Sequence, residues 1–303
     1  MLEWVLPFSL LIFLLLVVGF YTQKKTLAPS SSTPQQPTDT TSFLEIKDFK
    51  VFYQQAGSGP DVLLLHGIGA SSYTWRLLLP LLSRHYRVTA VDLPGFGKST
   101  KNVSVSYGLD AQVERLIEIM DRLRISQAHL VGSSMGGAIA LWLARKYPER
   151  VLHLALISPA ASQGLVHYDF FKHARIGTWV TPFVGPRIGR RILNYVYHDR
   201  NLITAETVEK YMEPYMTDPA SVVTFIKAVE ALRDARLPID LSQIQCKVAL
   251  LYGEQDLVIR KKHMEKVRSS FVAAPQYFSH PTLGHHPMEE DPQWVFECLR
   301  TFF

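Results

Sequence analysis

Residues 128–136, AHLVGSSMG, carry the clearest indication of the fold of this chain. The apolar residues that open the stretch predict a buried strand, and those that follow it have helical spacing. Gly132–Gly136 matches the pattern G-x-S-x-G, in which a tight strand-to-helix turn lifts a serine hydroxyl above a sheet. The flanking glycines are required because a Cβ there would collide with the neighbouring strand or helix. Centring the pattern on Ser133 would need glycine at positions 131 and 135, so Ser134 is the predicted nucleophile.

Short apolar runs alternate with longer helical stretches from Phe43 onward. This alternation predicts an α/β fold, with a mainly parallel sheet that helices cover on both faces. Strands are expected at Val62–Leu65, Tyr86–Val91, Ala128–Val131, Leu152–Ile157 and Val248–Tyr252, and helices at Tyr107–Leu123 and Met135–Tyr147.

The alternation stops after Ile157 and resumes at Lys247. The residues between are helical in pattern, and Asp218-Pro219 is typical of a helix start. One face of the helix that follows is apolar, at Val222, Phe225, Ile226, Val229 and Leu232. We therefore expect a helical cap at residues 161–246, inserted between two parts of the α/β core, 43–160 and 247–303.

A serine nucleophile needs a base, and the base needs an acid that orients it. In this kind of fold the three residues occur in the order serine, acid, histidine, and the last two follow late strands. Asp256 follows the expected strand Val248–Tyr252, and His285 comes after a glycine near the C-terminus. We predict a triad of Ser134, Asp256 and His285. Glu254 remains an alternative acid and His286 an alternative base.

The motif His66-Gly67-Ile68-Gly69 follows the expected strand Val62–Leu65. A loop at this position contributes one backbone N–H to the oxyanion hole, and the residue after the nucleophile contributes the other. The predicted donors are therefore the backbone N–H groups of Ile68 and Met135. Each such donor is typically worth about 3–4 kcal/mol of transition-state stabilisation.

The N-terminal residues predict a membrane anchor at 1–23 and a flexible tether at 24–42. No side chain from Trp4 to Tyr21 is charged, and roughly 18 helical residues at about 1.5 Å each approach the thickness of a bilayer's hydrocarbon core. A cleaved signal peptide is the alternative, but the basic start and small-residue exit are missing. Lys24 and Lys25 after the span favour a cytoplasmic catalytic domain over a periplasmic or extracytoplasmic one.

Composition excludes several other classes of function. The net charge of +5 comes without a basic cluster or a nucleic-acid-binding motif, so no nucleic-acid partner is expected. Cys246 and Cys298 lie outside any metal-binding spacing and are expected to be reduced thiols. No metal and no organic cofactor is implied.

These motifs together resemble the α/β-hydrolase superfamily, from about Val51 to the C-terminus. The resemblance rests on His66-Gly67, Asp92–Ser99, the Ser134 turn, Gly253–Asp256 and Gly284-His285. It implies that Asp92–Ser99 is a structural turn, and that an enzyme with serine as nucleophile is neither a dehalogenase nor an epoxide hydrolase. An apolar N-terminal segment before such a domain is similar to membrane-bound monoacylglycerol lipases.

The expected activity is therefore hydrolysis of a lipid-like carboxylic ester, with monoacylglycerol as the best candidate. A C–C bond hydrolase, a thioesterase and a cofactor-free haloperoxidase are alternatives with the same triad, and a non-catalytic binding protein is a further one. The oligomeric state does not follow from the sequence.

The cap mixes basic and aromatic residues between His173 and Tyr197. These are Arg175, Arg187, Arg190, Arg191, Trp179, Phe183, Tyr195 and Tyr197. Such a mixture suits a surface that rests on anionic lipid headgroups, and it equally suits an ordinary cap helix with a solvated basic face. The expected anchor favours membrane contact, because a tethered cap lies near lipid.

Overall fold

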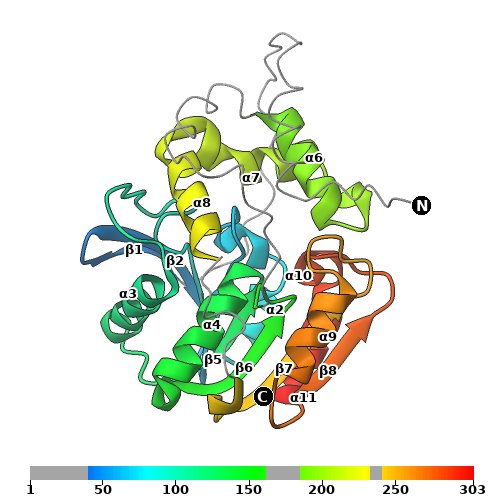
Figure 1. Ribbon diagram of the computed structural model, residues 1–303. Coiled ribbons are helices and arrows are strands. Elements are labelled where there is room, and N and C mark those ends of the chain that lie inside the picture. Colours follow the sequence, from blue (N-terminus) through cyan, green and yellow to red (C-terminus); the bar gives the residue numbers. More distant parts are fainter. Residues whose placement is uncertain (1–39, 162–184, 233–240) are drawn as a thin grey trace.

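The structure is a computed structural model that describes residues 40–161, 185–232 and 241–303 (Figure 1). Its strands form one sheet in the order β1-β2-β4-β3-β5-β6-β7-β8. The strands are β1 (Thr40–Ile46), β2 (Phe49–Ala56), β3 (Asp61–Leu65), β4 (Arg87–Val91), β5 (Ala128–Ser133), β6 (Val151–Ile157), β7 (Lys247–Gly253) and β8 (Gln276–His280). Strands β1 and β2 pair antiparallel with their neighbours, and all other pairs are parallel.

Helices cover both faces of the sheet. Helices α3 (Leu109–Arg122), α4 (Met135–Lys146) and α9 (Lys261–Ser269) bury their apolar residues on one face. The opposite face packs against α2 (Leu79–Leu82), α10 (Pro287–Glu290) and α11 (Pro292–Phe302). Because both faces are covered, the central strands β3 and β5 are buried along nearly their whole length, which is why they read as unbroken apolar runs.

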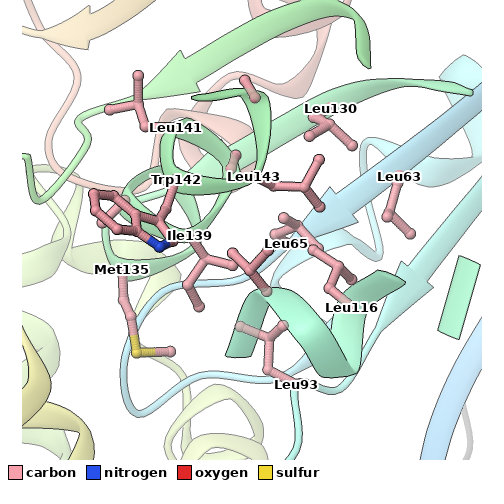
Figure 2. Close-up of a cluster of buried hydrophobic side chains, with 14 of the residues drawn as sticks. Leu63, Leu65, Leu93, Leu116, Leu130, Met135, Ile139, Leu141, Trp142 and Leu143 are labelled. Atoms are coloured by element: carbon pink, nitrogen blue, oxygen red, sulfur yellow. The ribbon is translucent and has the colours of Figure 1, made fainter. Parts of the chain in front are cut away.

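Figure 2 shows the larger of these two cores around α4. Leucines of β3 and β5 meet Met135 and Ile139 on α4 and Leu116 on α3. Helix α4 is buried from Met135 to Ala144, so all but its last two residues, Arg145 and Lys146, pack in the core on this face of the sheet. The first turn of this helix is thereby fixed relative to the end of β5.

All five expected strands are present, with ends that differ by up to two residues. Strands β1, β2 and β8 are present in addition and were not predicted from the sequence pattern. Strand β1 begins at Thr40 and pairs Thr40–Ser42 with Tyr53–Gln55. The expected end of the tether at residue 42 is therefore wrong, because its last residues form an edge strand that is mostly exposed and thus lacks an apolar run.

The described residues between β6 and β7 form helices. They are helices α6 (Pro186–Val196), α7 (Ala205–Thr217) and α8 (Ala220–Ala231) and the short 3-10 turns η6 (Arg200–Leu202) and η7 (Leu241–Gln243). The side chain of Asp218 accepts the N–H of Ala220 at 2.9 Å, as expected for a helix start. Thr224 on α8 donates to the carbonyl oxygen of Gly95 at 2.7 Å and ties this helix to the core.

Several expectations lie outside the described residues. They concern the anchor at 1–23, the tether up to residue 39, and Arg175, Trp179 and Phe183 of the cap. Within the described ranges, no helix combines the length and the apolar character that a membrane span requires.

Two histidines stack near the amino ends of β5 and β6. The rings of His129 and His153 lie 4.9 Å apart, and their Nδ1 atoms are 3.1 Å apart. Phe303 stacks on the ring of His129 at 4.3 Å. Burial, followed by the neighbouring His153, lowers the pKa of His129 from 6.5 to about 4, so the pair is neutral at pH 7.

This pair makes the stability of the fold sensitive to acid. Between pH 6.5 and 4 the unfolded chain binds a proton at His129 that the folded chain does not bind, so stability falls as pH is lowered through this window. A shift from 6.5 to about 4 corresponds to about 3 kcal/mol. We expect the free energy of unfolding of H129L, measured in urea from pH 8 to pH 4, to fall less than that of the wild type by about this amount. Parallel curves for the two proteins would contradict the prediction.

Candidate active site

Ser134 occupies the turn between β5 and α4 with φ 51° and ψ −114°. A positive φ is unfavourable for a residue with a Cβ, so the surrounding structure must impose it. The N–H of Ser134 donates to the carbonyl oxygen of Ile157 at 3.0 Å, and its own carbonyl accepts the N–H of Ala160 at 2.9 Å. These bonds to the end of β6 hold the turn in place.

The two glycines of the motif are required by close backbone contacts, one within the turn and one with β3. A Cβ on Gly132 would lie 2.5 Å from the carbonyl oxygen of Gly136. A Cβ on Gly136 would lie 2.2 Å from the carbonyl oxygen of Leu65 on β3. Both distances are far below van der Waals contact, which is the collision expected from the sequence. Ser133 lies in β5 with its hydroxyl buried, and within the described residues that hydroxyl has no hydrogen-bond partner.

Asp256 and His285 form a buried pair. The Nδ1 of His285 lies 2.8 Å from Oδ2 of Asp256, and the side chains of His285 and Asp256 are 5% and 0% exposed. The other carboxylate oxygen, Oδ1, accepts the N–H groups of Val258 at 2.7 Å and Ile259 at 2.8 Å. Because an ionised carboxylate only accepts, His285 donates through Nδ1, which leaves Nε2 free to take a proton.

The structure separates the alternative residues from this pair. Glu254 is exposed, and its carboxylate accepts the hydroxyl of Ser279 at 3.0 Å. His286 is buried with Nδ1 3.1 Å from Oε1 of Glu289, and burial lowers the pKa of His286. The carboxylate of Asp256, and not that of Glu254, therefore bonds to an imidazole, and that imidazole belongs to His285.

The loop after β3 lies against Ser134. A Cβ on Gly67 would be 3.2 Å from the Cβ of Ser134, so Ile68 follows at the edge of the serine turn. Met135 is the first residue of α4. Of the two predicted oxyanion donors, Met135 is therefore next to Ser134 in the chain, and the loop that carries Ile68 is next to Ser134 in space. Within the described residues no hydrogen bond joins Ser134 Oγ to His285, whose Nδ1 is bonded to Asp256.

His66 supports this loop. Its Nδ1 donates to the carbonyl oxygen of Gly67 at 2.7 Å, and its Nε2 accepts the N–H of Leu93 at 2.9 Å. Burial lowers the pKa of His66, which keeps the ring neutral and able to make both bonds. The imidazole therefore joins the oxyanion loop to the turn that follows β4.

Asp92–Ser99 is a structural turn, as the resemblance implied. The carboxylate of Asp92 accepts the N–H of Ser72 at 2.6 Å and the N–H of Lys98 at 2.7 Å. Gly97 has φ 53°, and a Cβ there would lie 2.1 Å from Oδ2 of Asp92. The turn is closed around this carboxylate, which has no room to reach a substrate.

A third buried carboxylate, that of Glu289, does not follow from the sequence pattern. Glu289 on α10 is 2% exposed, forms an ion pair with Arg76, and accepts the hydroxyls of Thr74 and Tyr211. Burial alone would raise its pKa, but the bond to His286 and the charge of Arg76 outweigh burial and lower that pKa to about 2. The sequence feature that indicates this contact is that Glu289 follows His286 by three residues. Within the described ranges, no group of three or more His, Cys, Asp or Glu side chains could hold a metal ion.

The chain belongs to the α/β-hydrolase fold family, whose pattern it matches over residues 60–292. It is 32% identical over 213 residues to 2-hydroxy-6-oxo-2,4-heptadienoate hydrolase of Pseudomonas putida, covering 67% of this chain and 74% of that enzyme. It is 28% identical over 252 residues to an uncharacterized carboxylesterase of Bacillus subtilis, covering 80% of this chain and 79% of the relative.

Among solved structures it resembles a membrane phospholipase A that is a bacterial virulence factor. The TM-score is 0.74 at 29% identity, over 87% of this chain and 85% of that one. A meta-cleavage product hydrolase superposes with a TM-score of 0.73 at 26% identity, over 86% of this chain and 97% of that one. The chain is therefore a hydrolase, and its relatives include both C–C bond hydrolases and esterases or lipases.

The geometry of the turn predicts which serine reacts. S134A should lose on the order of a million-fold in kcat, because it removes the predicted attacking hydroxyl, and the loss of a single oxygen atom should leave the fold intact. S133A should retain most activity, since that hydroxyl is buried in β5. Turnover of a p-nitrophenyl ester and labelling by a fluorophosphonate probe measure both variants. A damaging S133A beside an active S134A would move the nucleophile to Ser133.

The two carboxylates after β7 should differ in effect. D256N should cost about four orders of magnitude in kcat, because an amide in place of the carboxylate leaves the imidazole of His285 in the wrong tautomer. E254Q should change kcat less than about threefold, since the carboxylate of Glu254 is exposed and bonds to a serine hydroxyl. Circular dichroism serves as the control for folding. The acid would be misassigned if E254Q were the weaker enzyme.

Proposed function

We propose that this chain is a carboxylic-ester hydrolase with Ser134 as nucleophile, His285 as base and Asp256 as the acid that orients it. Ser134 Oγ attacks the ester carbonyl carbon while His285 Nε2 takes the hydroxyl proton. The alcohol leaves with that proton, and an acyl-serine remains. Water then attacks the acyl group by the same route and releases the acid. The observation that carries the proposal is the buried bond of 2.8 Å between His285 and Asp256, together with the φ of 51° that the turn imposes on Ser134.

The N–H groups of Ile68 and Met135 are the proposed donors to the oxyanion. The negative charge on the carbonyl oxygen develops only in the transition state, so donors held by the loop after β3 and by the first turn of α4 stabilise that state preferentially. His66 contributes by fixing the loop, and no residue of this mechanism requires a metal or an organic cofactor.

The charges around the site favour a neutral ester over a carboxylate substrate. The buried polar and charged side chains of the described residues include no Arg or Lys. Arg76, which is partly buried, is already paired with Glu289. Among the described residues, a dienoate such as those named for the C–C bond hydrolases would find no buried counter-charge to offset its lost hydration. A C–C bond hydrolase remains the second candidate because several relatives at 26–35% identity carry that activity in their names.

A lipid-like acyl ester is the proposed substrate class, and monoacylglycerol is the first member to test. The similarity to a membrane phospholipase A supports a substrate that resides in a membrane. The uncharged stretch Trp4–Tyr21 supports a single-pass anchor, with the enzyme on the cytoplasmic side. On α6, the exposed Arg187, Arg190 and Arg191 lie opposite the buried Ile188 and Leu193, which suits contact with anionic headgroups.

A truncated protein separates the chemistry from the membrane. Removing residues 1–39 leaves β1 and the triad intact, so kcat/KM on dissolved p-nitrophenyl butyrate should stay within about twofold. Hydrolysis of monoacylglycerol in anionic vesicles should fall at least about tenfold, because the anchor raises the concentration of enzyme at the lipid surface. S134A is the inactive control for both substrates.

Two outcomes would contradict the proposal. Equal rates of the full-length and truncated proteins on vesicles would show that the lipid surface plays no part. A kcat/KM on a 2-hydroxy-6-oxo-dienoate that exceeds the value on every ester would favour the second candidate.

A further inference from the structure

The loop that carries His285 is enclosed on two sides by backbone. On the side of the sheet, a Cβ on Gly253 of β7 would lie 2.2 Å from the carbonyl oxygen of Gly284 and 2.3 Å from that of Leu283. On the side of the cap, a Cβ on Gly284 would lie 2.7 Å from the amide nitrogen of His198. The loop therefore cannot shift toward the sheet without moving β7, and it cannot shift toward the cap without moving the backbone at His198.

The cap makes direct bonds to this loop. The N–H of His285 itself donates to the carbonyl oxygen of Val196, the last residue of α6, at 2.8 Å. The chain then continues through Tyr197, which is buried beside the ring of His286 with 5.7 Å between ring centres. The backbone of the catalytic histidine is thus bonded to a segment that belongs to the cap.

One carboxylate joins the two segments. Oε1 of Glu290 accepts the N–H of Gly284 at 2.8 Å, and Oε2 accepts the N–H groups of His198 and Asp199 at 2.9 Å each. Glu290 is only partly buried, and these bonds satisfy both of its oxygens with three backbone donors. An acceptor with two oxygens is required here, because each oxygen faces an N–H that belongs to a different segment.

We propose that Glu290 is a positioning residue for His285, which fixes the catalytic base by clamping its loop to the cap segment 196–199. This part of the cap is then a permanent component of the active site, and it does not act as a lid. The neighbouring Glu289 binds Arg76 and Tyr211. The two adjacent carboxylates therefore hold the loop of His285 and His286 to the cap and to the segment after the oxyanion loop. The inference rests on the proposed role of His285 as the base.

The test compares E290Q with T224V. Glutamine keeps the shape of the side chain but turns an N–H₂ toward one set of amide donors, so His285 should be displaced and kcat should fall on the order of 100-fold. The loss should be equal for p-nitrophenyl acetate and for a long-chain ester, with KM within about threefold. T224V removes the bond from α8 to Gly95, which also ties the cap to the core but lies outside the clamp. It should lower the melting temperature with kcat within about threefold of the wild type.

A second pair of variants keeps the test decisive if E290Q does not fold. Asp199 is exposed and has φ −77°, so proline fits the backbone there and removes only one donor to Glu290. D199A keeps that N–H and loses the same side chain. The ratio of kcat between D199A and D199P therefore measures the amide alone, and we expect D199P to be the slower variant by at least about fivefold.

The outcomes separate this inference from the proposed function. A wild type that is labelled at Ser134 and turns over esters, with an E290Q variant that keeps kcat and raises only KM, would overturn the inference alone. Equal kcat values for D199A and D199P would also overturn the inference and leave the proposed function standing. A wild type that neither hydrolyses esters nor reacts with the fluorophosphonate probe would overturn the proposed function and the inference with it.

Discussion

Ser134 is held at φ 51° between β5 and α4, a conformation that costs a residue with a Cβ roughly 1–3 kcal/mol. The rest of the molecule has to supply this energy. Strand β5 is fully buried at the centre of the sheet, and α4 is buried from Met135 to Ala144, so neither element can rotate to relieve the turn. The lack of a Cβ on Gly136 lets the first turn of α4 pack directly against the end of β3, from which the oxyanion loop leads, because a Cβ there would lie 2.2 Å from the carbonyl oxygen of Leu65.

The base reaches the site through a different kind of support. Ser134 depends on two regular elements in direct succession, whereas His285 lies on a loop between β8 and α10. Its ring is fixed by Asp256 and its backbone by Val196 and by the bonds of Glu290 to both segments. The helices of the cap therefore do more than cover the carboxyl edge of the sheet (Figure 1). Part of the cap holds the histidine that the core alone would leave on a flexible connection.

Four carboxylates near the C-terminal half of the chain have four different roles, and surroundings alone distinguish them. Asp256 is buried against an imidazole, while Glu254, two residues earlier, is exposed against a serine hydroxyl. Glu289 is buried among cationic and hydroxyl donors that lower its pKa to about 2, whereas burial raises the pKa of its neighbour Glu290. Residue type and spacing set no such differences, because the partners of each carboxylate, and the pKa shifts of Glu289 and Glu290, follow from the groups that the fold brings near.

The α/β class, the central strands and the serine turn could all be predicted from the amino-acid sequence. These follow from local rules, since a parallel strand covered on both faces must be apolar throughout and a strained turn must have glycines at fixed positions. The order of serine, acid and histidine could also be read directly. Edge strands β1 and β8 could not, because residues exposed on one side have no unbroken apolar run. The choice between Asp256 and Glu254, and the roles of Glu289 and Glu290, required the folded chain, since their partners come from segments up to 215 residues away.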